Sequence, residues 1–307
     1  MNCCIIGKGS IGIRHSKNLY KLKIKTFFLR RKIITSNKNE LSLNDKKIKK
    51  MDFFIITNPS SLHQETIRNI LKYNKPILVE KPFITQKKIL EEIKGFQKIF
   101  VLYQMRYDPR INFIKKKINK KKIKKSIFFW RTYLPNWHTN EDYRRSYAAR
   151  KNLGGGVIFT MSHEIDLAIY LLGDVKYLMV KTKKNKLKVN VEDNAEIFLK
   201  HTSGCESKIF LDFASKKLNR NFKIYNKKNY ISWDFYEDKI QFQKKSIKFR
   251  YNNDDIYFKE IRDTIRKIKD KKYDVSRIHI NKILHTHQII IACYESLKLN
   301  KKIILQN

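Results

Sequence analysis

The sequence predicts an α/β protein in two parts: a doubly wound parallel sheet, followed by an α/β domain whose open sheet is mostly antiparallel. Three observations predict this fold class. In the first third of the chain, short apolar runs alternate with amphipathic stretches. A glycine-rich loop directly follows the first apolar run. From about residue 127, the rhythm changes, and segments of strand character follow at hairpin-like spacing.

The apolar runs of the first third are continuous, as expected for strands that are buried on both faces of a parallel sheet. The predicted strands are Cys3–Ile6, Thr26–Leu29, Phe53–Thr57, Pro76–Val79 and Ile99–Tyr103. The amphipathic stretches between them predict the helices Ile11–Leu22, Leu62–Tyr73 and Thr85–Lys98. Strands that alternate with helices favour a doubly wound sheet.

The second part begins with a predicted strand, Ser126–Tyr133, and a long apolar helix, Val157–Leu172, which Gly173 ends. Segments of strand character follow, and they are typical of a mostly antiparallel sheet. These segments are Lys176–Thr182, Ala195–His201, Lys208–Phe213, Asn221–Asn226, Tyr230–Asp234 and Lys239–Gln243. Two helices and a short strand complete the prediction: Ile256–Lys269, Ile278–Leu297 and Lys302–Leu305.

The chain has 307 residues, which is too long for one small domain and suits two domains. We expect the boundary near the basic run Lys115–Lys125, which gives a dinucleotide-binding domain at 1–120 and a substrate and oligomerisation domain at 121–307. The basic run itself is interpreted either as a solvated helix face or as a linker that crosses between the domains.

No segment reaches the roughly 18 uncharged apolar residues of a membrane span. The first apolar run has no basic leader and is shorter than the core of a signal peptide. We therefore expect a cytoplasmic protein with no membrane partner. The cysteines lack the spacing of metal ligands, so we expect ordinary buried thiols and no metal site: Cys3, Cys4, Cys205 and Cys293.

The formal net charge of +40 suggests a nucleic-acid-binding protein, but the composition favours another explanation. Lysine outnumbers arginine by 53 to 15, and glycine and proline number only nine and five. This pattern is typical of a genome biased toward A and T, with lysine spread over every exposed position. We therefore expect no specific nucleic-acid partner, although salt-sensitive, non-specific binding is expected at low salt.

The glycine loop, Gly7-Lys8-Gly9-Ser10-Ile11-Gly12, fits the G-x-G-x-x-G pattern between a strand and a helix. In the Rossmann fold, the first glycine makes the tight turn, the second leaves room for a pyrophosphate, and the third lets helix and strand pack closely. The pattern predicts that Gly7, Gly9, Ser10, Ile11 and Gly12 bind a dinucleotide. The alternative interpretation is a glycine turn without a ligand.

The second predicted strand ends in Phe28-Leu29-Arg30-Arg31-Lys32, about twenty residues after the glycine loop. An acidic residue at this place would accept hydrogen bonds from the adenosine 2′-hydroxyl and select NAD, but none is present. Arg30 and Arg31 would instead pair with a 2′-phosphate. We therefore expect NADP to be preferred, with NAD as the second cofactor. The alternative is that both arginines are ordinary basic residues of a basic protein.

Three further motifs identify a resemblance that covers nearly the whole chain. Thr57-Asn58-Pro59-Ser60-Ser61-Leu62-His63 and Glu80-Lys81-Pro82 each follow a strand, and His163-Glu164-Ile165-Asp166 follows the triple glycine Gly154–Gly156. With the glycine loop, they resemble the glucose-fructose oxidoreductase, inositol dehydrogenase and rhizopine catabolism (Gfo/Idh/MocA) family. The segment from Tyr133 to Gly156 further resembles members linked to bacterial surface-sugar biosynthesis, including acylneuraminate-type sugars.

The resemblance implies a Rossmann domain, a second domain with an open sheet, and a homo-oligomer that is a dimer or a tetramer. It also implies NAD(P)-dependent hydride transfer between a nicotinamide and a hydroxyl or keto carbon of a sugar-like substrate. It further implies a cis bond between Lys81 and Pro82. We expect Asn58, Pro59, His63 and Glu80 to lie beside the cofactor together with Lys81.

Lys81 is the first candidate catalytic residue. It lies at the carboxyl end of a predicted parallel strand, where such sheets bind ligands. Partial burial and the nicotinamide cation would lower its pKa and let it exchange a proton with the substrate hydroxyl. Glu80 would orient Lys81 or the nicotinamide ribose. His163 is the second candidate acid or base, and Asp166 shares its helix face.

One position departs from the family pattern. Many relatives carry an aspartate one turn before the histidine, whereas Phe159 and Thr160 stand there in this chain. Thr160 can hydrogen-bond a substrate hydroxyl but cannot carry the charge of a carboxylate. The full set of candidate substrate-binding residues is Arg106, Trp137, Tyr143, Arg144, Thr160 and Asp166.

Two other hypotheses stay open at this level. The missing aspartate is compatible with a non-catalytic dinucleotide-binding protein, which would bind cofactor without turnover. A nucleic-acid-binding protein on a Rossmann scaffold would present one continuous basic groove instead of scattered lysines. Glu80-Lys81-Pro82 and His163 favour the enzyme.

Overall fold

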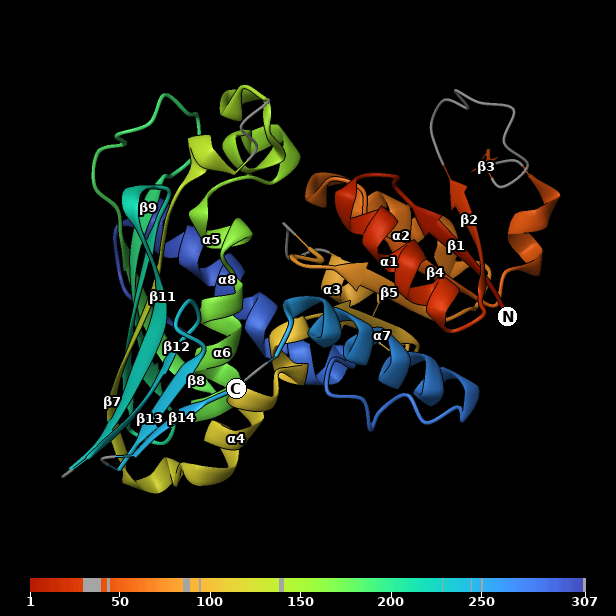
Figure 1. Ribbon diagram of the computed structural model, residues 1–307. Helices are drawn as coiled ribbons and strands as arrows, with labels where there is room; N and C mark the ends of the chain where they lie inside the picture. Colours follow the sequence, from red (N-terminus) through yellow and green to blue (C-terminus); the bar gives the residue numbers. More distant parts are fainter. Residues whose placement is uncertain are drawn as a thin grey trace. The chain divides into compact units, whose positions relative to one another are not determined.

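A computed structural model describes the chain in two compact units (Figure 1). Unit 1 comprises Met1–Tyr107 and Asn253–Leu284, and unit 2 comprises Asp108–Asn252 and His285–Asn307. The described residues are 1–29, 40–42, 45–84, 89–93 (without the side chains of 90 and 91), 95–137, 141–227, 229–243, 245–249 and 251–305.

The sheet of unit 1 is parallel throughout, with the strand order β3-β2-β1-β4-β5-β6. Its strands are β1 (Asn2–Ile6), β2 (Lys25–Leu29), β3 (Glu40–Leu41), β4 (Phe53–Ile56), β5 (Ile77–Glu80) and β6 (Ile99–Leu102). Nearly every side chain of β1, β4, β5 and β6 is buried, as predicted for strands covered on both faces. The order reverses between β1 and β4, which is where doubly wound sheets bind ligands.

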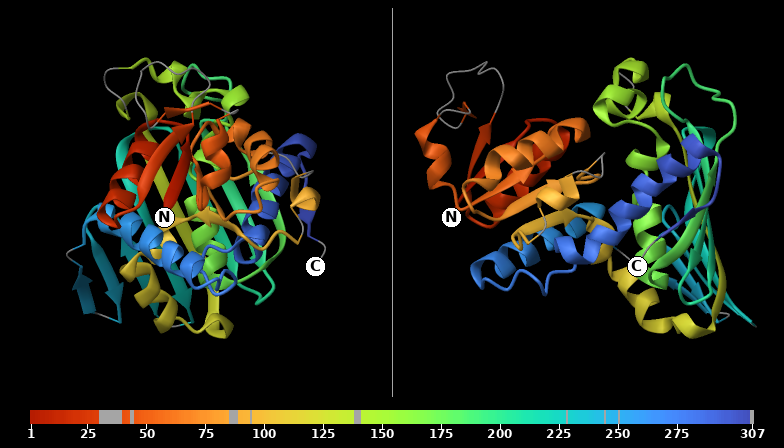
Figure 2. Two further views of the ribbon diagram at one scale, coloured as in Figure 1. Left: turned by 90° about the vertical axis from the view of Figure 1, so that its right-hand side faces the viewer. Right: turned by 180° about the vertical axis from the view of Figure 1, so that it is seen from behind.

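The helices of unit 1 cover both faces of this sheet. They are α1 (Ser10–Lys21), α2 (His63–Leu71), α3 (Ile89–Glu92) and α7 (Asn253–Lys269). Helices α1 and α7 pack against each other on one face, in front of the strands in Figure 1, and α2 lies in front of them in the reverse view of Figure 2. Right-handed crossovers that leave β1 and β4 in opposite directions require this division.

Two predictions for unit 1 need comment. The helix expected at Thr85–Lys98 is wrong in its second half, because α3 ends at Glu92 and Gly95 adopts a φ of +87°. Residues 85–88 lie outside the described part of the chain. The consecutive domains 1–120 and 121–307 remain a prediction, whereas the packing of α7 against α1 places Asn253–Leu284 with the N-terminal residues.

The sheet of unit 2 is mostly antiparallel, as predicted. Its order is β14-β13-β12-β11-β7-β10-β9-β8-β15, and only the β7–β10 pair is parallel among the described strands. The strands are β7 (Ile123–Tyr133), β8 (Val175–Lys181), β9 (Asn194–His201), β10 (Glu206–Asp212), β11 (Ala214–Asn226), β12 (Tyr230–Asp234), β13 (Lys239–Phe242), β14 (Lys245–Lys248) and β15 (Ile303–Ile304). Burial alternates strictly along β9, so this sheet has one covered face.

The helices α5 (Val157–Thr160) and α6 (His163–Leu172) pack on the covered face (Figure 1). Unit 2 also contains α4 (Pro109–Lys117) and most of α8 (Ile280–Leu299). The single helix predicted at Val157–Leu172 is wrong, because the chain turns at Met161 and Ser162. Both halves are almost fully buried, and the turn falls at polar residues, Ser162, His163 and Glu164.

No single helix among the described residues has the length and apolar composition of a membrane span. The bent pair Lys151–Thr160 and His163–Leu172, with 44° between its halves, meets the criterion only when both halves are joined. The basic run Lys115–Lys125 lies wholly in unit 2 and is mostly exposed. The linker interpretation is therefore wrong, since the chain passes between the units before this run.

Helix α7 buries a carboxyl group in unit 1. Glu260 has no exposed surface, and neither of its carboxyl oxygens has a hydrogen-bond partner among the described residues. Burial raises the pKa of Glu260 well above its ordinary value, and the charge of Glu80 raises this pKa further. The folded protein therefore favours the protonated form.

We expect Glu260→Gln to stabilise the protein at about pH 8 and to have little effect near pH 4. In the wild type, the unfolded chain releases this proton first as the pH rises. The free energy of unfolding of the wild type therefore falls as the pH rises above the ordinary pKa of a carboxyl group. The total loss is about 1.4 kcal/mol for each unit by which folding raises the pKa of Glu260. Thermal denaturation of both proteins across this pH range checks the prediction. A constant difference between their melting temperatures would contradict it.

Candidate active site

The glycine loop of unit 1 connects β1 to α1, and each of its glycines has a different environment. A Cβ at Gly7, where φ is +108°, would lie 2.8 Å from the backbone nitrogen of Asn58. A Cβ at Gly12 would overlap the carbonyl oxygen of Gly7. A Cβ at Gly9 would meet no atom within 4 Å, so space is left open at the N-terminus of α1. This is the cradle that a pyrophosphate requires.

A pocket of about 300 Å³ adjoins the loop. It is lined by Gly7 and Lys8, by Leu29 at the end of β2, and by residues of the β4–α2 connection that include Asn58 and Pro59. The Oδ1 atom of Asn58 is buried and has no hydrogen-bond partner among the described residues, whereas its Nδ2 donates to Thr66 (2.8 Å). An unpartnered acceptor beside an open cradle fits a ligand that carries hydroxyl groups.

His63 ties two loops of this region together. Its Nε2 lies 2.8 Å from the carbonyl oxygen of Asn58, and its Nδ1 lies 2.9 Å from that of Pro82. Burial lowers the pKa of His63, while both hydrogen bonds act in the opposite direction. The side chain is 1% exposed and holds the residues around Asn58 against the Glu80–Pro82 segment. A direct contact of His63 with the cofactor stays a prediction.

Lys81 follows β5 at the carboxyl edge of the sheet, and the Lys81–Pro82 peptide bond is cis, as the resemblance implies. The preceding Glu80 accepts a hydrogen bond from His15 on α1, with 2.8 Å between His15 Nε2 and Glu80 Oε1. His15 has no exposed surface, and no motif in the sequence marks it. This bond fixes the strand end that carries Lys81 against the helix that follows the glycine loop.

A carboxylate lies beside β2, the strand after which the sequence showed no acidic residue to bind the adenosine ribose. Glu40 on β3 pairs with Phe28 of β2 in register, and its Oε1 accepts a hydrogen bond from Lys8 Nζ (2.7 Å). The prediction missed Glu40 because it counted only residues that directly continue β2. Arg30 and Arg31, on which the NADP prediction rests, lie outside the described residues.

In unit 2, the triple glycine connects to α5 through close backbone contacts. A Cβ at Gly155 would lie 2.5 Å from the carbonyl oxygen of Tyr147, and one at Gly156 would overlap the carboxylate of Glu192. Glu192 Oε1 accepts hydrogen bonds from the backbone N–H of Ile158 (3.2 Å) and from the hydroxyl of Tyr294 (2.8 Å). Glu192 thus caps the start of α5, and burial raises its pKa.

His163 is the first residue of α6 and belongs to a stack of side chains. Its side chain is 3% exposed, and its ring is stacked on that of Trp130 on β7, with 6.2 Å between centroids and 28° between planes. On Trp130 lies the guanidinium of Arg220, 3.9 Å from the ring centroid. Arg220 Nε donates to Glu164 Oε1 (2.8 Å), and both side chains are almost fully buried. The stack therefore fixes the plane of the His163 ring.

Three predicted substrate-binding residues are buried. Asp166 has no exposed surface and accepts a hydrogen bond from Thr286 Oγ1 (3.0 Å). Arg106 is 3% exposed and donates to the carbonyl oxygens of Arg277 (3.0 Å) and Lys282 (3.2 Å). These contacts hold Asp166 and Arg106 within the protein, and a role for either in binding the substrate stays a prediction. Thr160 is 2% exposed at the end of α5.

The remaining candidates lie on the segment that follows β7. The indole N–H of Trp137 donates to Thr132 Oγ1 (2.8 Å), and its ring packs edge-on against Phe213. Arg144 is exposed and pairs with Asp142 through two hydrogen bonds of 2.9 and 3.0 Å, which lower the pKa of Asp142. Tyr143 is half-buried. Trp137 is thus anchored, whereas Arg144 can reach a ligand.

The described residues contain no group of three or more histidine, cysteine or acidic side chains that could hold a metal ion. All four cysteines are buried and unpaired, as predicted from their spacing. Burial raises the pKa of the thiols, to about 12 for Cys4 and about 11 for Cys205. These thiols are therefore inert at neutral pH.

Two family profiles match the chain. The profile of the oxidoreductase family with an NAD-binding Rossmann fold matches residues 1–100, and that of the Gfo/Idh/MocA C-terminal domain matches residues 112–232. Among curated proteins, the putative oxidoreductase YteT of Bacillus subtilis is 27% identical over 135 residues. This match spans 41% of the present chain and 31% of YteT.

Solved structures share the fold over the full length. The WlbA dehydrogenase from Bordetella pertussis, in complex with NADH and UDP-GlcNAcA, has a TM-score of 0.80 at 18% identity, covering 100% of this chain and 99% of that one. A myo-inositol dehydrogenase from Corynebacterium glutamicum has a TM-score of 0.78 at 15% identity, with coverage of 100% and 99%. At these identities, the likeness establishes the fold, and the profiles establish the family. The chain belongs to the Gfo/Idh/MocA family of NAD-binding oxidoreductases.

Proposed function

We propose that the chain is an NAD(P)-dependent dehydrogenase or reductase that acts on a CH–OH group of a sugar or sugar-derived substrate. The observation that carries this proposal is the open space at Gly9 in the glycine loop. The loop that contains Asn58 lines the pocket next to it. The Asn58 loop is joined through His63 to the segment that carries Lys81. Cofactor site and acid–base candidate thus belong to one connected framework.

The residues of unit 1 fit a dinucleotide. Gly7, Gly9 and the N-terminus of α1 would hold its pyrophosphate, and Asn58 Oδ1 would accept a hydrogen bond from a ribose hydroxyl. The bound nicotinamide supplies the hydride acceptor or donor. Lys81 takes the proton of the substrate hydroxyl during oxidation and returns it during reduction. His163 orients the same hydroxyl, with its ring plane fixed by Trp130.

For the substrate, we propose a sugar, including nucleotide sugars and acidic sugars. The aromatic rings of Trp137 and Tyr143 suit the apolar face of a sugar, and the exposed Arg144 suits a carboxylate or phosphate. WlbA was solved with UDP-GlcNAcA, which makes nucleotide-linked sugar acids the first class to screen. The test is substrate-dependent change in the absorbance of NADH and NADPH over a panel of sugars and nucleotide sugars. Cofactor binding without turnover on any of them would favour the non-catalytic alternative, which Phe159 and Thr160 motivate.

Loosening the stack beneath His163 should slow turnover. We expect Trp130→Leu to lower kcat by about tenfold or more, because a small misplacement of a catalytic group costs this much. The dissociation constant of the cofactor should stay constant, since the glycine loop belongs to unit 1. Trp130→Phe should retain most activity. In a His163→Gln background, adding Trp130→Leu should cause no further decrease in kcat. An additional tenfold decrease in the double variant would show that Trp130 does not act through His163.

Cofactor preference should depend on two groups of opposite charge. We propose that Arg30 and Arg31 bind the 2′-phosphate of NADP, whereas Glu40 opposes it. Arg30→Ala should weaken NADPH binding about tenfold, which corresponds to the loss of one charge-assisted hydrogen bond. The same substitution should leave NADH binding nearly constant. Glu40→Gln should shift the preference toward NADPH. Fluorescence titration with both nucleotides measures the effects, with Lys17→Ala on α1 as a charge-matched control. Equal weakening of both nucleotides by Arg30→Ala would contradict the assignment.

A further inference from the structure

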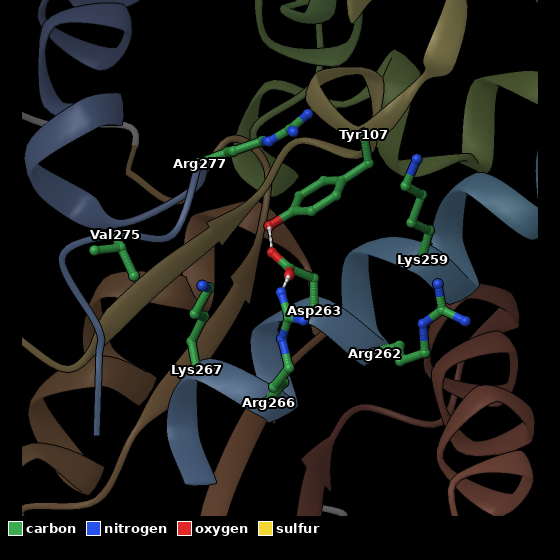
Figure 3. Close-up of a pocket in the computed structure, with 8 residues that line it drawn as sticks. All are labelled: Tyr107, Lys259, Arg262, Asp263, Arg266, Lys267, Val275 and Arg277. Atoms are coloured by element: carbon green, nitrogen blue, oxygen red, sulfur yellow. Dashed lines mark hydrogen bonds and ion pairs between the residues drawn. The ribbon is translucent and has the colours of Figure 1, made fainter. Parts of the chain in front are cut away.

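Unit 1 contains a second and larger pocket, of about 590 Å³, beside α7 (Figure 3). It shares no residue with the pocket next to the glycine loop. Its charged lining residues comprise five cations and one carboxylate: Lys259, Arg262, Arg266, Lys267, Arg277 and Asp263. Four of these recur along α7 at spacings of three, four and one, so they line one face of the helix.

Arginine is over-represented in this lining. Three of the five cations are arginines, although the whole chain has 53 lysines and only 15 arginines. Arginine binds phosphate and carboxylate groups through two parallel hydrogen bonds, which lysine cannot form. The general basicity of the chain predicts lysines in an arbitrary hollow. Arg266 is paired with Asp263, and Arg277 donates to the carbonyl oxygen of Arg106 (3.2 Å). Arg262, with Lys259 and Lys267 beside it on α7, is therefore the part of this lining that favours recognition of an anion.

The carboxylate in the lining is already neutralised. Asp263 Oδ2 accepts a hydrogen bond from the hydroxyl of Tyr107 (3.1 Å), and its Oδ1 accepts one from Arg266 Nη2 (2.8 Å). Figure 3 shows these three side chains at the centre, with Lys259 and Lys267 on either side along α7. Tyr107 is 2% exposed, so the floor of the pocket is held in place. The remaining cations are left in excess.

Within the described part of the chain, Lys259, Arg262 and Lys267 form no ion pair with a carboxylate. A concave and cationic surface of this kind attracts anions.

We propose that this pocket binds a small anion that carries a diphosphate or triphosphate group, independently of the dinucleotide site. Several charges on adjacent phosphates match several cations within one hollow. A nucleic acid spaces single charges along a strand and requires an extended groove. The phosphate chain can belong to an inorganic polyphosphate or to a nucleotide, and both sources share the same chemistry.

The experiment is calorimetric titration of the full chain with tripolyphosphate at moderate salt, in the presence of saturating NAD. The test variant is Lys259→Ala/Lys267→Ala, and the matched control is Lys17→Ala/Lys298→Ala, which removes two exposed helical lysines elsewhere. We expect a single site in the wild type, about tenfold weaker binding in the test variant, and nearly unchanged binding in the control. Tripolyphosphate should also raise the melting temperature of the wild type more than that of the test variant. Lys267→Arg should retain binding, which separates loss of the site from loss of the fold.

The two sources are distinguished by repeating the titration with ATP. Equal affinity for ATP and tripolyphosphate identifies the phosphate chain alone as the ligand, and tighter binding of ATP identifies a nucleotide. Either result supports a binding site in this pocket, provided that the test variant binds the ligand more weakly than the wild type does. The proposal is overturned if the control variant loses as much affinity as the test variant, if saturating NAD abolishes the binding, or if an oligonucleotide binds more tightly than tripolyphosphate.

Discussion

Replacing Lys81 with methionine should lower kcat by roughly a hundredfold to ten-thousandfold, which is the range for a missing general acid or base. Methionine keeps the length and apolar stem of lysine but cannot exchange a proton. The cofactor should still bind, because the cradle is formed by the glycine loop and not by Lys81. Steady-state kinetics on the best substrate of the panel, with cofactor binding measured in parallel, checks both expectations.

Lys17→Met provides the control for this substitution, since Lys17 is an exposed lysine of α1 in the same unit. It should retain full activity. The pH profile gives a second criterion, because the ionisation of the catalytic base disappears with Lys81. A Lys81→Met variant that retains wild-type kcat would refute the role of Lys81, even if the cofactor remains essential.

Substitutions at two glycines of the same loop should have different effects, one on nucleotide binding and the other on the stability of the fold. Gly9→Val should abolish nucleotide binding, with a loss of about a hundredfold or more in affinity, because its side chain fills the space meant for the pyrophosphate. The fold should remain intact, since Gly9 has an extended backbone with φ of −79° and ψ of −176°. Thermal denaturation and fluorescence titration with NADH measure the two effects separately.

Gly12→Val is the matched comparison. Its Cβ would overlap the carbonyl oxygen of Gly7 and would lie 2.9 Å from Thr57 Oγ1, so the helix must shift away from the strand. Overpacking of this kind costs about 1–3 kcal/mol, which lowers the melting temperature by several degrees. A lower melting temperature for Gly9→Val and an unchanged melting temperature for Gly12→Val would contradict the assignment of open space to Gly9.

The sequence predicted the parts of the site that are written locally. The glycine loop, Glu80-Lys81-Pro82 and the triple glycine are short motifs between recognisable elements, and the structure confirms the elements around them. The sequence could not show pairs that are distant along the chain. His15 and Glu80 are 65 residues apart, Lys8 and Glu40 are 32 apart, and Ile158 and Glu192 are 34 apart.

Polar residues near a motif were also hard to classify from the sequence. Asp166 and Arg106 were predicted to contact the substrate, and the sequence could not show that both form buried hydrogen bonds to residues more than 100 positions away. The break between α5 and α6 was overlooked although polar residues mark it (Ser162, His163 and Glu164), because apolar residues flank them on both sides. The return of α7 to unit 1 depends on tertiary packing, which an amphipathic pattern cannot locate.

Hydride transfer between a nicotinamide and a sugar carbon is measured most directly by isotope transfer. NADH or NADPH labelled with deuterium at the transferable position is incubated with the protein and keto forms of the sugar panel, and the products are analysed by mass spectrometry. With the wild type, we expect a sugar product to gain the deuterium, and with Lys81→Met we expect no sugar product to gain it. Binding of the labelled cofactor with no deuterium in any sugar product would refute hydride transfer to these sugars and would leave a dinucleotide-binding protein without this activity.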